Sequence, residues 1–245
     1  MKNNPGYSWQ YDEFKQVGTD YSSKTEVEHY DSSHADFRDM EAEGAKVLEM
    51  LQIREDDVLI DFGSGTGAFA IQAARRCARV YAIDVSQAML DFSAAKAIKA
   101  GRKNIEFRHS GFMTYEHDAS PVDAVVTTFA FHHLPDFWKG IALKRVNTML
   151  KPGGSFYIHD VILEEPGALE NIAALINNLA KAGGEPLRED AERHFRYEFS
   201  TYDWVMDGLL ERSGFHIVSK VIRDGVIGSY LCRKETAPWE RTAEQ

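Results

Sequence analysis

Few cysteines, no excess of positive charge and no long apolar run occur in this sequence, and each shortage excludes a class of protein. Cys77 and Cys232 are the only cysteines among 245 residues, which excludes a disulfide framework and suits two reduced thiols in the cytosol. Lys and Arg number 28 against 38 Asp and Glu, for a net charge of −10, which argues against sequence-independent nucleic-acid binding. No stretch reaches the roughly 20 apolar residues of a membrane span, and residues 1–6 lack a signal-type apolar region. We therefore predict a cytoplasmic protein whose partners include neither nucleic acid nor membrane.

What the sequence does contain is an alternation of apolar strand-type runs and amphipathic helical segments. Strand-type runs occur at 58–62, 80–84, 105–108, 122–128 and 155–163, and helical spacing separates most of them. Ser86 is expected to cap the helix after the second strand, 151–154 to end the helix before the fifth, and 200–203 to begin a late helix. Such alternation predicts a parallel sheet with right-handed crossovers. Two further strands, 215–221 and 226–233, flank Asp224-Gly225, which is a tight hairpin signal. The length and the 44% hydrophobic content fit one α/β domain with an added cap.

The most informative stretch is the turn that follows the first predicted strand. Asp61 is followed by Gly63, Gly65 and Gly67, and a helical pattern then begins. Glycine is needed where a backbone takes positive φ or closely approaches a ligand. Asp84 ends the second strand about twenty residues beyond the first glycine, where a ribose diol is usually held. Gly63, Gly65 and Ala68 would also fit a loose NAD fingerprint, so NAD stays open as an alternative at this point.

Asp61, spaced two residues before the first glycine, and the third glycine at Gly67 favour a different cofactor. The run 61–67, Asp-Phe-Gly-Ser-Gly-Thr-Gly, resembles the first motif of class I S-adenosylmethionine-dependent methyltransferases of small-molecule type. Further motifs of that family stand in order at 84–90, 123–126, 131–134 and 150–154. The resemblance covers roughly residues 41–234. It implies a Rossmann-like, seven-stranded, mostly parallel sheet with a C-terminal antiparallel hairpin and an α-helical lid insertion.

The resemblance also implies S-adenosylmethionine as cofactor and a set of residues that bind it. These are Asp61, Gly63, Ser64, Gly65, Gly67, Asp84, Val85, Met89, Gly111, Phe112 and Phe129. One position departs from the family, because similar proteins often carry Gly-Asp-Ala after the third strand, and that Asp accepts a hydrogen bond from the adenine amine. Here Ser110-Gly111-Phe112 stands in its place, and Gly111 has no side chain that could accept. We expect the Phe112 amide, with packing against Met89 and Val85, to hold adenine instead.

Candidates for a catalytic base come from the ends of the fourth and fifth strands, which face the pocket mouth in this fold. His132 follows the fourth strand, and His159 and Asp160 lie near the end of the fifth. An unperturbed histidine has a pKa near physiological pH and suits proton removal. The base is needed only if the acceptor arrives protonated, since alignment alone can suffice. The remaining histidines show no ligand spacing with Cys or Glu, so we predict no metal site.

The chain is expected to have three parts. Residues 1–33 form an aromatic N-terminal arm that either packs on the surface or covers the cofactor, residues 34–234 form the methyltransferase domain, and residues 235–245 form a polar tail. Residues 164–200 interrupt the alternation and form either a lid over the strand ends or a solvated connection. The primary hypothesis is methyl transfer to a small-molecule acceptor. A cofactor-binding sensor without turnover and an NAD-dependent oxidoreductase are the alternatives, and the oligomeric state stays open.

Overall fold

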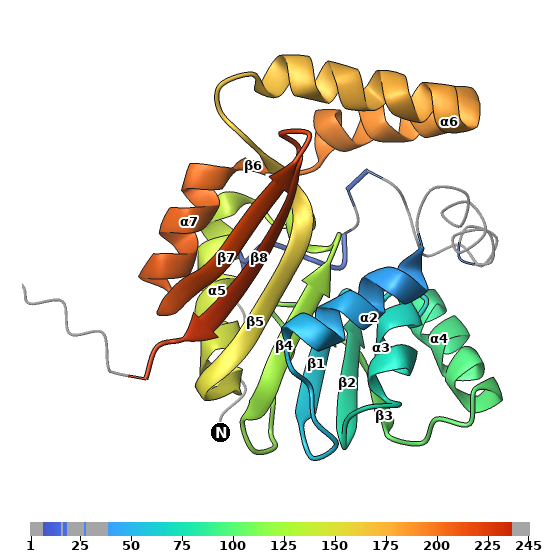
Figure 1. The fold of residues 1–245 in the computed structure, drawn as a ribbon, viewed down its shortest axis with the longest axis vertical. Coiled ribbons are helices and arrows are strands. Elements are labelled where there is room, and N and C mark those ends of the chain that lie inside the picture. The colour runs from blue at the N-terminus through green and yellow to red at the C-terminus, as the bar shows by residue number, and fades with distance from the viewer. Residues whose placement is uncertain (1–6, 16, 19–26, 28–38, 237–245) are drawn as a thin grey trace, which may run out of the picture.

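A central twisted sheet, with helices on both faces, forms the body of the protein (Figure 1). The computed structural model describes residues 7–15, 17–18, 27 and 39–236. The strands follow the order β3-β2-β1-β4-β5-β8-β7. Their bounds are β1 Val58–Phe62, β2 Arg79–Asp84, β3 Ile105–His109, β4 Val122–Thr128, β5 Leu150–Leu163, β7 Phe215–Arg223 and β8 Ile227–Lys234. The first five strands of this order are parallel, and β8 is antiparallel to both of its neighbours. The predicted Rossmann-like sheet is thereby confirmed.

The closing hairpin has the turn that its sequence predicted. Asp224 and Gly225 have φ values of 51° and 66°, and positive φ at both central residues is the requirement of a type I′ turn. This turn inserts β8 between β5 and β7. The C-terminal antiparallel hairpin is therefore confirmed.

Two helical layers bury the two faces of the sheet. Helices α2 (Met40–Met50) and α3 (Ala68–Ala73) contribute Val47, Leu48 and Ala70 to one apolar cluster. Helices α5 (Asp136–Met149) and α7 (Asp203–Arg212) contribute to the larger cluster on the opposite face. Helix α4 (Gln87–Lys99) lies next to α3 in Figure 1.

Side-chain caps fix where two of these helices begin. Asp39 Oδ1 accepts from the Ala42 amide at 2.9 Å at the start of α2. Ser86 Oγ accepts from the Met89 amide at 3.2 Å at the start of α4, as its sequence position predicted. Such caps satisfy amides that have no partner inside the helix. The start of α4 is consequently fixed directly after Asp84.

The run 151–154, expected to separate a helix from a strand, lies inside β5 instead. Leu150 pairs with Val122, and the register shifts between Val122 and Ala124. Gly153 has a φ of 74° and absorbs this irregularity. Pairing with β4 thus extends β5 across residues that local propensity would leave unpaired.

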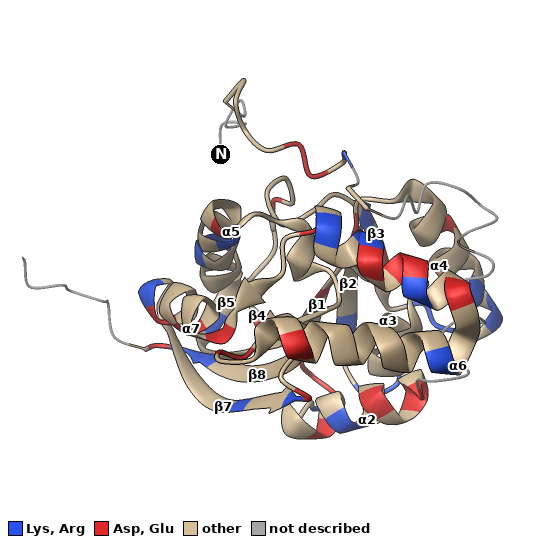
Figure 2. Cartoon of the chain, turned by 90° about the horizontal axis from the view of Figure 1, so that it is seen from above, with Lys and Arg blue, Asp and Glu red and all other residues tan. Residues whose placement is uncertain are grey.

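The insertion after β5 is mostly helical. Helix α6 (Ala168–Tyr197) has non-helical backbone at Gly183 and Gly184, where its axis breaks. The charged stretch 188–197 belongs to its second half and is not an irregular connection. A two-residue strand, β6 (Thr201–Tyr202), then pairs with β5 where a helix start was expected. Figures 1 and 2 both show α6 over the end of the sheet to which β5 leads.

The proposed N-terminal arm and polar tail fall largely outside the described residues. Of the arm, residues 7–15, 17, 18 and 27 are described, and of the tail only 235 and 236. Within the described part of the chain, no helix is both long and apolar enough to cross a membrane.

Candidate functional site

The turn after β1 is bonded to the end of β2, which brings Asp84 against the glycines. The amides of Gly63 and Ser64 donate to the Ile83 carbonyl at 2.8 and 3.0 Å. The Gly65 amide donates to Asp84 Oδ2 and the Ser86 amide to Asp84 Oδ1, each at 2.8 Å. Asp84 is buried, and burial raises the pKa of its carboxyl. Each carboxylate oxygen keeps a further lone pair that could accept from a ribose hydroxyl.

Gly65 differs from the other two glycines of the turn, because space lies open beside it. Its φ is 50°, and an added Cβ would meet no heavy atom within 4 Å. A Cβ at Gly63 would collide with Ala130, and one at Gly67 would collide with Ser93. Gly65 therefore borders a cavity, whereas Gly63 and Gly67 are glycines because of close packing within the protein.

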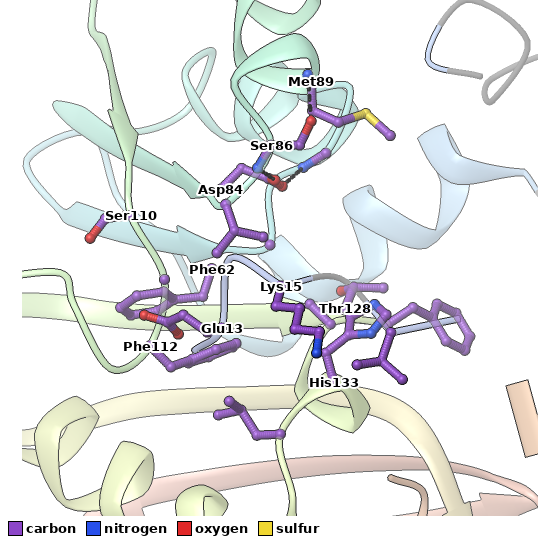
Figure 3. A pocket seen from close by; sticks show the side chains of 18 of the residues that line it. Glu13, Lys15, Phe62, Asp84, Ser86, Met89, Ser110, Phe112, Thr128 and His133 are labelled. Carbon is purple, nitrogen blue, oxygen red and sulfur yellow. Dashed lines mark hydrogen bonds between the residues drawn. The ribbon is translucent and has the colours of Figure 1, made fainter. Parts of the chain in front are cut away.

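Two hollows meet at this turn. The first hollow lies at the ends of β1 to β4, and the described N-terminal segment contributes to its wall. It is lined by the following residues, most of them drawn in Figure 3: Tyr11, Glu13, Lys15, Val17, Phe62, Gly63, Gly65, Asp84, Val85, Ser86, Met89, Ser110, Gly111, Phe112, Thr128, Phe129, Ala130, His133 and Leu134. The second hollow lies between α2 and the β5–β8–β7 side of the sheet, and its lining includes Asp61, Ser64, Phe69, Tyr157, His159, Arg223 and Ser229. Gly63, Gly65, Thr128 and Phe129 line both.

Most of the cofactor residues that the resemblance implied gather around these hollows. The first hollow contains Gly63, Gly65, Asp84, Val85, Met89, Gly111, Phe112 and Phe129. Asp61 and Ser64 line the second hollow, beside the shared glycines. Gly67 lines neither hollow and serves as the left-handed N-cap of α3. The binding role of each residue remains a proposal, but the structure brings all except Gly67 to the hollows.

Asp61 has the surroundings of a group that awaits a positively charged partner. Its side chain is buried, and its Oδ2 has no hydrogen-bond partner among the described residues. Burial, and then the nearby Asp84 charge, raise the pKa of Asp61 well above its ordinary value. Leaving a buried polar group unsatisfied is costly. An ammonium group next to Gly65, such as that of the methionine portion of S-adenosylmethionine, fits this carboxylate.

Glu13 is a site residue that sequence analysis missed. Its carboxylate accepts from the Met113 amide, at 3.1 Å to Oε1 and 3.0 Å to Oε2, and from Thr114 Oγ1 at 2.7 Å. A Cβ added to Gly111 would collide with this same carboxylate. The acid that the family places on the chain after β3 is thus matched in position by one from the N-terminal segment, and Figure 3 shows it beside Phe112. No local pattern around Glu13 indicates this role.

The expectation that His132 faces the acceptor does not hold. His132 is buried and lines neither hollow. Its Nδ1 lies 2.6 Å from Asp160 Oδ1, and its Nε2 lies 3.1 Å from Glu198 Oε2. The two carboxylates raise the pKa of His132 to about 9 despite the opposing effect of burial. The ring is therefore enclosed by acids and has no free nitrogen for an acceptor.

The hydrogen bonds of Asp160 likewise indicate a structural role. Its Oδ2 accepts from the amides of Phe131 and His132 at 2.8 and 3.2 Å, and its Oδ1 accepts from Val161 at 2.7 Å. Hydrogen bonds and the His132 charge hold its pKa well below the usual range although it is buried. Asp160 therefore anchors the segment after β4 and does not face either hollow.

His159 and His133 are the two histidines at the hollows. His159 lines the second hollow, where its Nδ1 lies 2.8 Å from Ser229 Oγ and its ring contacts the Phe129 ring at 4.8 Å between centroids. His133 lines the first hollow, and burial lowers its pKa to about 4. Of the three predicted catalytic residues, only His159 lines a hollow, and it is the second hollow, which Asp84 does not line.

Comparison with known proteins agrees with this geometry. Residues 59–154 match a family model described as a methyltransferase domain. An uncharacterized methyltransferase of Geobacillus kaustophilus is 29% identical over 204 residues, which cover 83% of this chain and 87% of that protein. These matches favour the methyltransferase interpretation over an NAD-dependent oxidoreductase.

Solved structures share the fold at low identity. A SAM-dependent methyltransferase from Aquifex aeolicus superposes with a TM-score of 0.61 at 21% identity, covering 86% of this chain and 98% of that one. Geranyl diphosphate C-methyltransferase from Streptomyces coelicolor, solved with Mg²⁺, geranyl diphosphate and S-adenosyl-L-homocysteine, gives 0.63 at 16% identity, with coverages of 79% and 78%. Both share the fold of this chain.

Proposed function

Because this chain belongs to the class I S-adenosylmethionine-dependent methyltransferases, we propose that it methylates a small molecule bound in the second hollow. The observation that carries this proposal is the meeting of the two hollows at Gly63, Gly65, Thr128 and Phe129. Residues of the first hollow would hold the adenosine portion of the cofactor, and Asp61, across the junction, would face its ammonium group, which leaves the reactive methyl at the junction. An acceptor in the second hollow would then approach from the opposite side, as in-line transfer requires.

Three acidic and two apolar side chains of the chain would hold the cofactor. Asp84 accepts from the ribose hydroxyls, Asp61 faces the ammonium group, and Glu13 accepts from the adenine amine. Phe112 and Met89 are buried and line the first hollow, where they supply apolar contact to the ring system. When bound, the cofactor supplies a methyl group that its positive sulfur already activates.

The chain itself supplies alignment and exclusion of water. Positioning of a nucleophile behind a reacting group can supply several kcal/mol of the barrier, up to about 7–11 in the best cases. His159 is the proposed proton acceptor for substrates that arrive protonated, because it lines the second hollow beside Phe129. The N-terminal segment and α6 are proposed to close over the reacting groups.

The test combines binding with turnover. S-adenosylhomocysteine should bind to wild type, and a panel of phenols, thiols, amines and carboxylic acids should include a substrate that yields it from S-adenosylmethionine. Gly65→Val should abolish both, since its side chain would enter the junction on a backbone that disfavours one. Gly101→Val is the matched control, because Gly101 also has positive φ and open space but lies after α4. Normal cofactor binding by a folded Gly65→Val protein would refute the proposed cradle.

A further inference from the structure

A second cluster of chemically active side chains lies where the end of α6 meets the sheet. His132 belongs to the short 3-10 helix η1 (Phe131–His133) after β4, and His194 and Glu198 come from the end of α6 and its C-cap. The ligand atoms of these three residues lie within 4.8 Å of one another. Their side chains are 8%, 15% and 6% exposed, respectively. The cluster is therefore nearly closed to solvent.

Each of the two histidine rings has one nitrogen that faces Glu198 and one that faces an outer partner. His132 Nε2 and His194 Nδ1 both face Glu198 Oε2. The opposite nitrogens are held from outside, His132 Nδ1 by Asp160 at 2.6 Å and His194 Nε2 by Ser200 Oγ at 2.7 Å. In protein metal sites, a ligating histidine is held in the same way through its second nitrogen, by a carboxylate or another acceptor. The Asp160 carboxylate accepts from His132 Nδ1, and Ser200 Oγ can accept from His194 Nε2 in the same way. The inner nitrogen of each neutral ring is then left with a lone pair directed toward Glu198.

A cation at that point would balance the charges of the cluster. Asp160 and Glu198 are two enclosed carboxylates, and a divalent cation would balance both with the imidazoles neutral. The buried lysine Lys139 donates instead to Asp136 and the Phe199 carbonyl. Because a Cβ at Gly18 would collide with the Glu198 carboxylate, the N-terminal segment closes a further side of the cluster.

We propose that His132, His194 and Glu198 bind one divalent transition-metal cation of the zinc class. Two imidazole nitrogens and one carboxylate oxygen suit Zn²⁺, which accepts nitrogen and oxygen ligands in four-coordinate sites. The ion joins the end of α6 to the segment after β4, beside His133 at the first hollow. It therefore clamps α6 over the strand ends. His194 and Glu198 are only four residues apart, but the third ligand, His132, lies 62 residues before His194, so sequence analysis did not bring the three together.

The test uses the full chain without a histidine tag, after chelator treatment and in the absence of S-adenosylmethionine. Competition against a chromophoric chelator should show one Zn²⁺ per chain, and Co²⁺ should give the visible absorption of a low-coordinate site. Ser200→Ala, which removes only an outer partner, should weaken Zn²⁺ binding about 10–100-fold. His194→Ala and Glu198→Gln should weaken it further. His216→Ala is the control, because His216 is exposed on β7, and it should bind as wild type does.

Two results would overturn the proposal, and neither depends on catalytic activity. Wild-type protein that takes up less than one Zn²⁺ per chain would exclude the site even if the variants fail to fold. Equal Zn²⁺ affinity in wild type and Ser200→Ala would show that binding occurs elsewhere. Hydrogen exchange of residues 190–199 tests the clamp, since Zn²⁺ should slow exchange there in wild type, and unchanged exchange would refute it.

Discussion

Exchange of one carboxylate between two positions tests how the adenine end of the cofactor is held. Glu13→Ala removes a carboxylate that accepts from Met113 and Thr114 and borders Gly111. Hydrogen bonds to charged groups contribute about 1.5–3 kcal/mol, and about 1.4 kcal/mol corresponds to a tenfold change in affinity. The dissociation constant of S-adenosylhomocysteine should therefore rise about ten- to hundredfold. Asp12→Ala is the control, because Asp12 is the exposed neighbouring acid and should bind as wild type does.

The reverse exchange should restore the lost affinity. Gly111 does not have positive φ, so an aspartate can adopt its backbone conformation. In Gly111→Asp alone, the new side chain collides with the Glu13 carboxylate and repels it, which should lower the melting temperature. In the double variant Glu13→Ala with Gly111→Asp, the collision is gone and an acid again stands at the end of β3. Calorimetry should then show most of the wild-type affinity.

A deaminated ligand separates recognition of adenine from general packing of the N-terminal segment. S-inosylhomocysteine lacks the exocyclic amine, so wild type should discriminate against it and Glu13→Ala should not. The reasoning is refuted if Glu13→Ala binds S-adenosylhomocysteine as Asp12→Ala does. It is refuted equally if the double variant binds no better than Glu13→Ala.

Three further predictions concern the junction and its acids. Asp84→Asn, which keeps one acceptor oxygen, should weaken S-adenosylhomocysteine binding at least about tenfold by calorimetry; unchanged affinity would exclude a ribose contact. Asp61→Asn should raise the melting temperature of the ligand-free protein and shrink the shift caused by S-adenosylhomocysteine. The pKa of folded Asp61 is raised by burial above its ordinary 3.8, so wild-type stability is lost as pH rises through the raised value. The melting temperature of Asp61→Asn should hence exceed that of wild type by an amount that grows from pH 4 to pH 8, and a constant difference would contradict this. His159→Asn should keep cofactor affinity but lose about 10²–10⁴-fold in turnover for a protonated acceptor; turnover within a few-fold of wild type would show transfer by alignment alone.

Local sequence signals predicted the sheet and the turn because the physics behind them is local. The alternation of apolar runs, the Ser86 cap and the Asp224-Gly225 hairpin each depend on a few consecutive residues. The packing around the glycines of the turn could not be predicted from the sequence. Three similar glycines follow Asp61, yet only at Gly65 would an added Cβ enter open space, because Ala130 and Ser93 stand where a Cβ would lie at Gly63 and Gly67.

Contacts between distant segments explain the features that sequence analysis missed. Glu13 meets Met113 across 100 residues of sequence, and His132 meets Glu198 through the end of α6. Neither pairing leaves a spacing motif, because the partners are brought together only when the sheet and its insertion have formed. The misplacement of His132 has the same cause, since its position after β4 indicated the pocket mouth while Asp160 and Glu198 hold the ring away from it.

Asp61 and Asp160 show why the surroundings of an acid decide its role better than its place on a strand. Both are buried near the carboxyl ends of sheet strands. The Asp160 carboxylate accepts from three amides and from His132, and its pKa falls. Within the part of the chain that the structure describes, Asp61 Oδ2 has no hydrogen-bond partner, and the pKa of Asp61 rises. Burial of an uncompensated charge is costly. At Asp160 the hydrogen bonds and His132 already offset this cost, whereas no described group offsets it at Asp61. A positively charged group therefore gains more by binding beside Asp61 than beside Asp160. We therefore propose that the charged end of the cofactor lies beside Gly65 rather than beside β5.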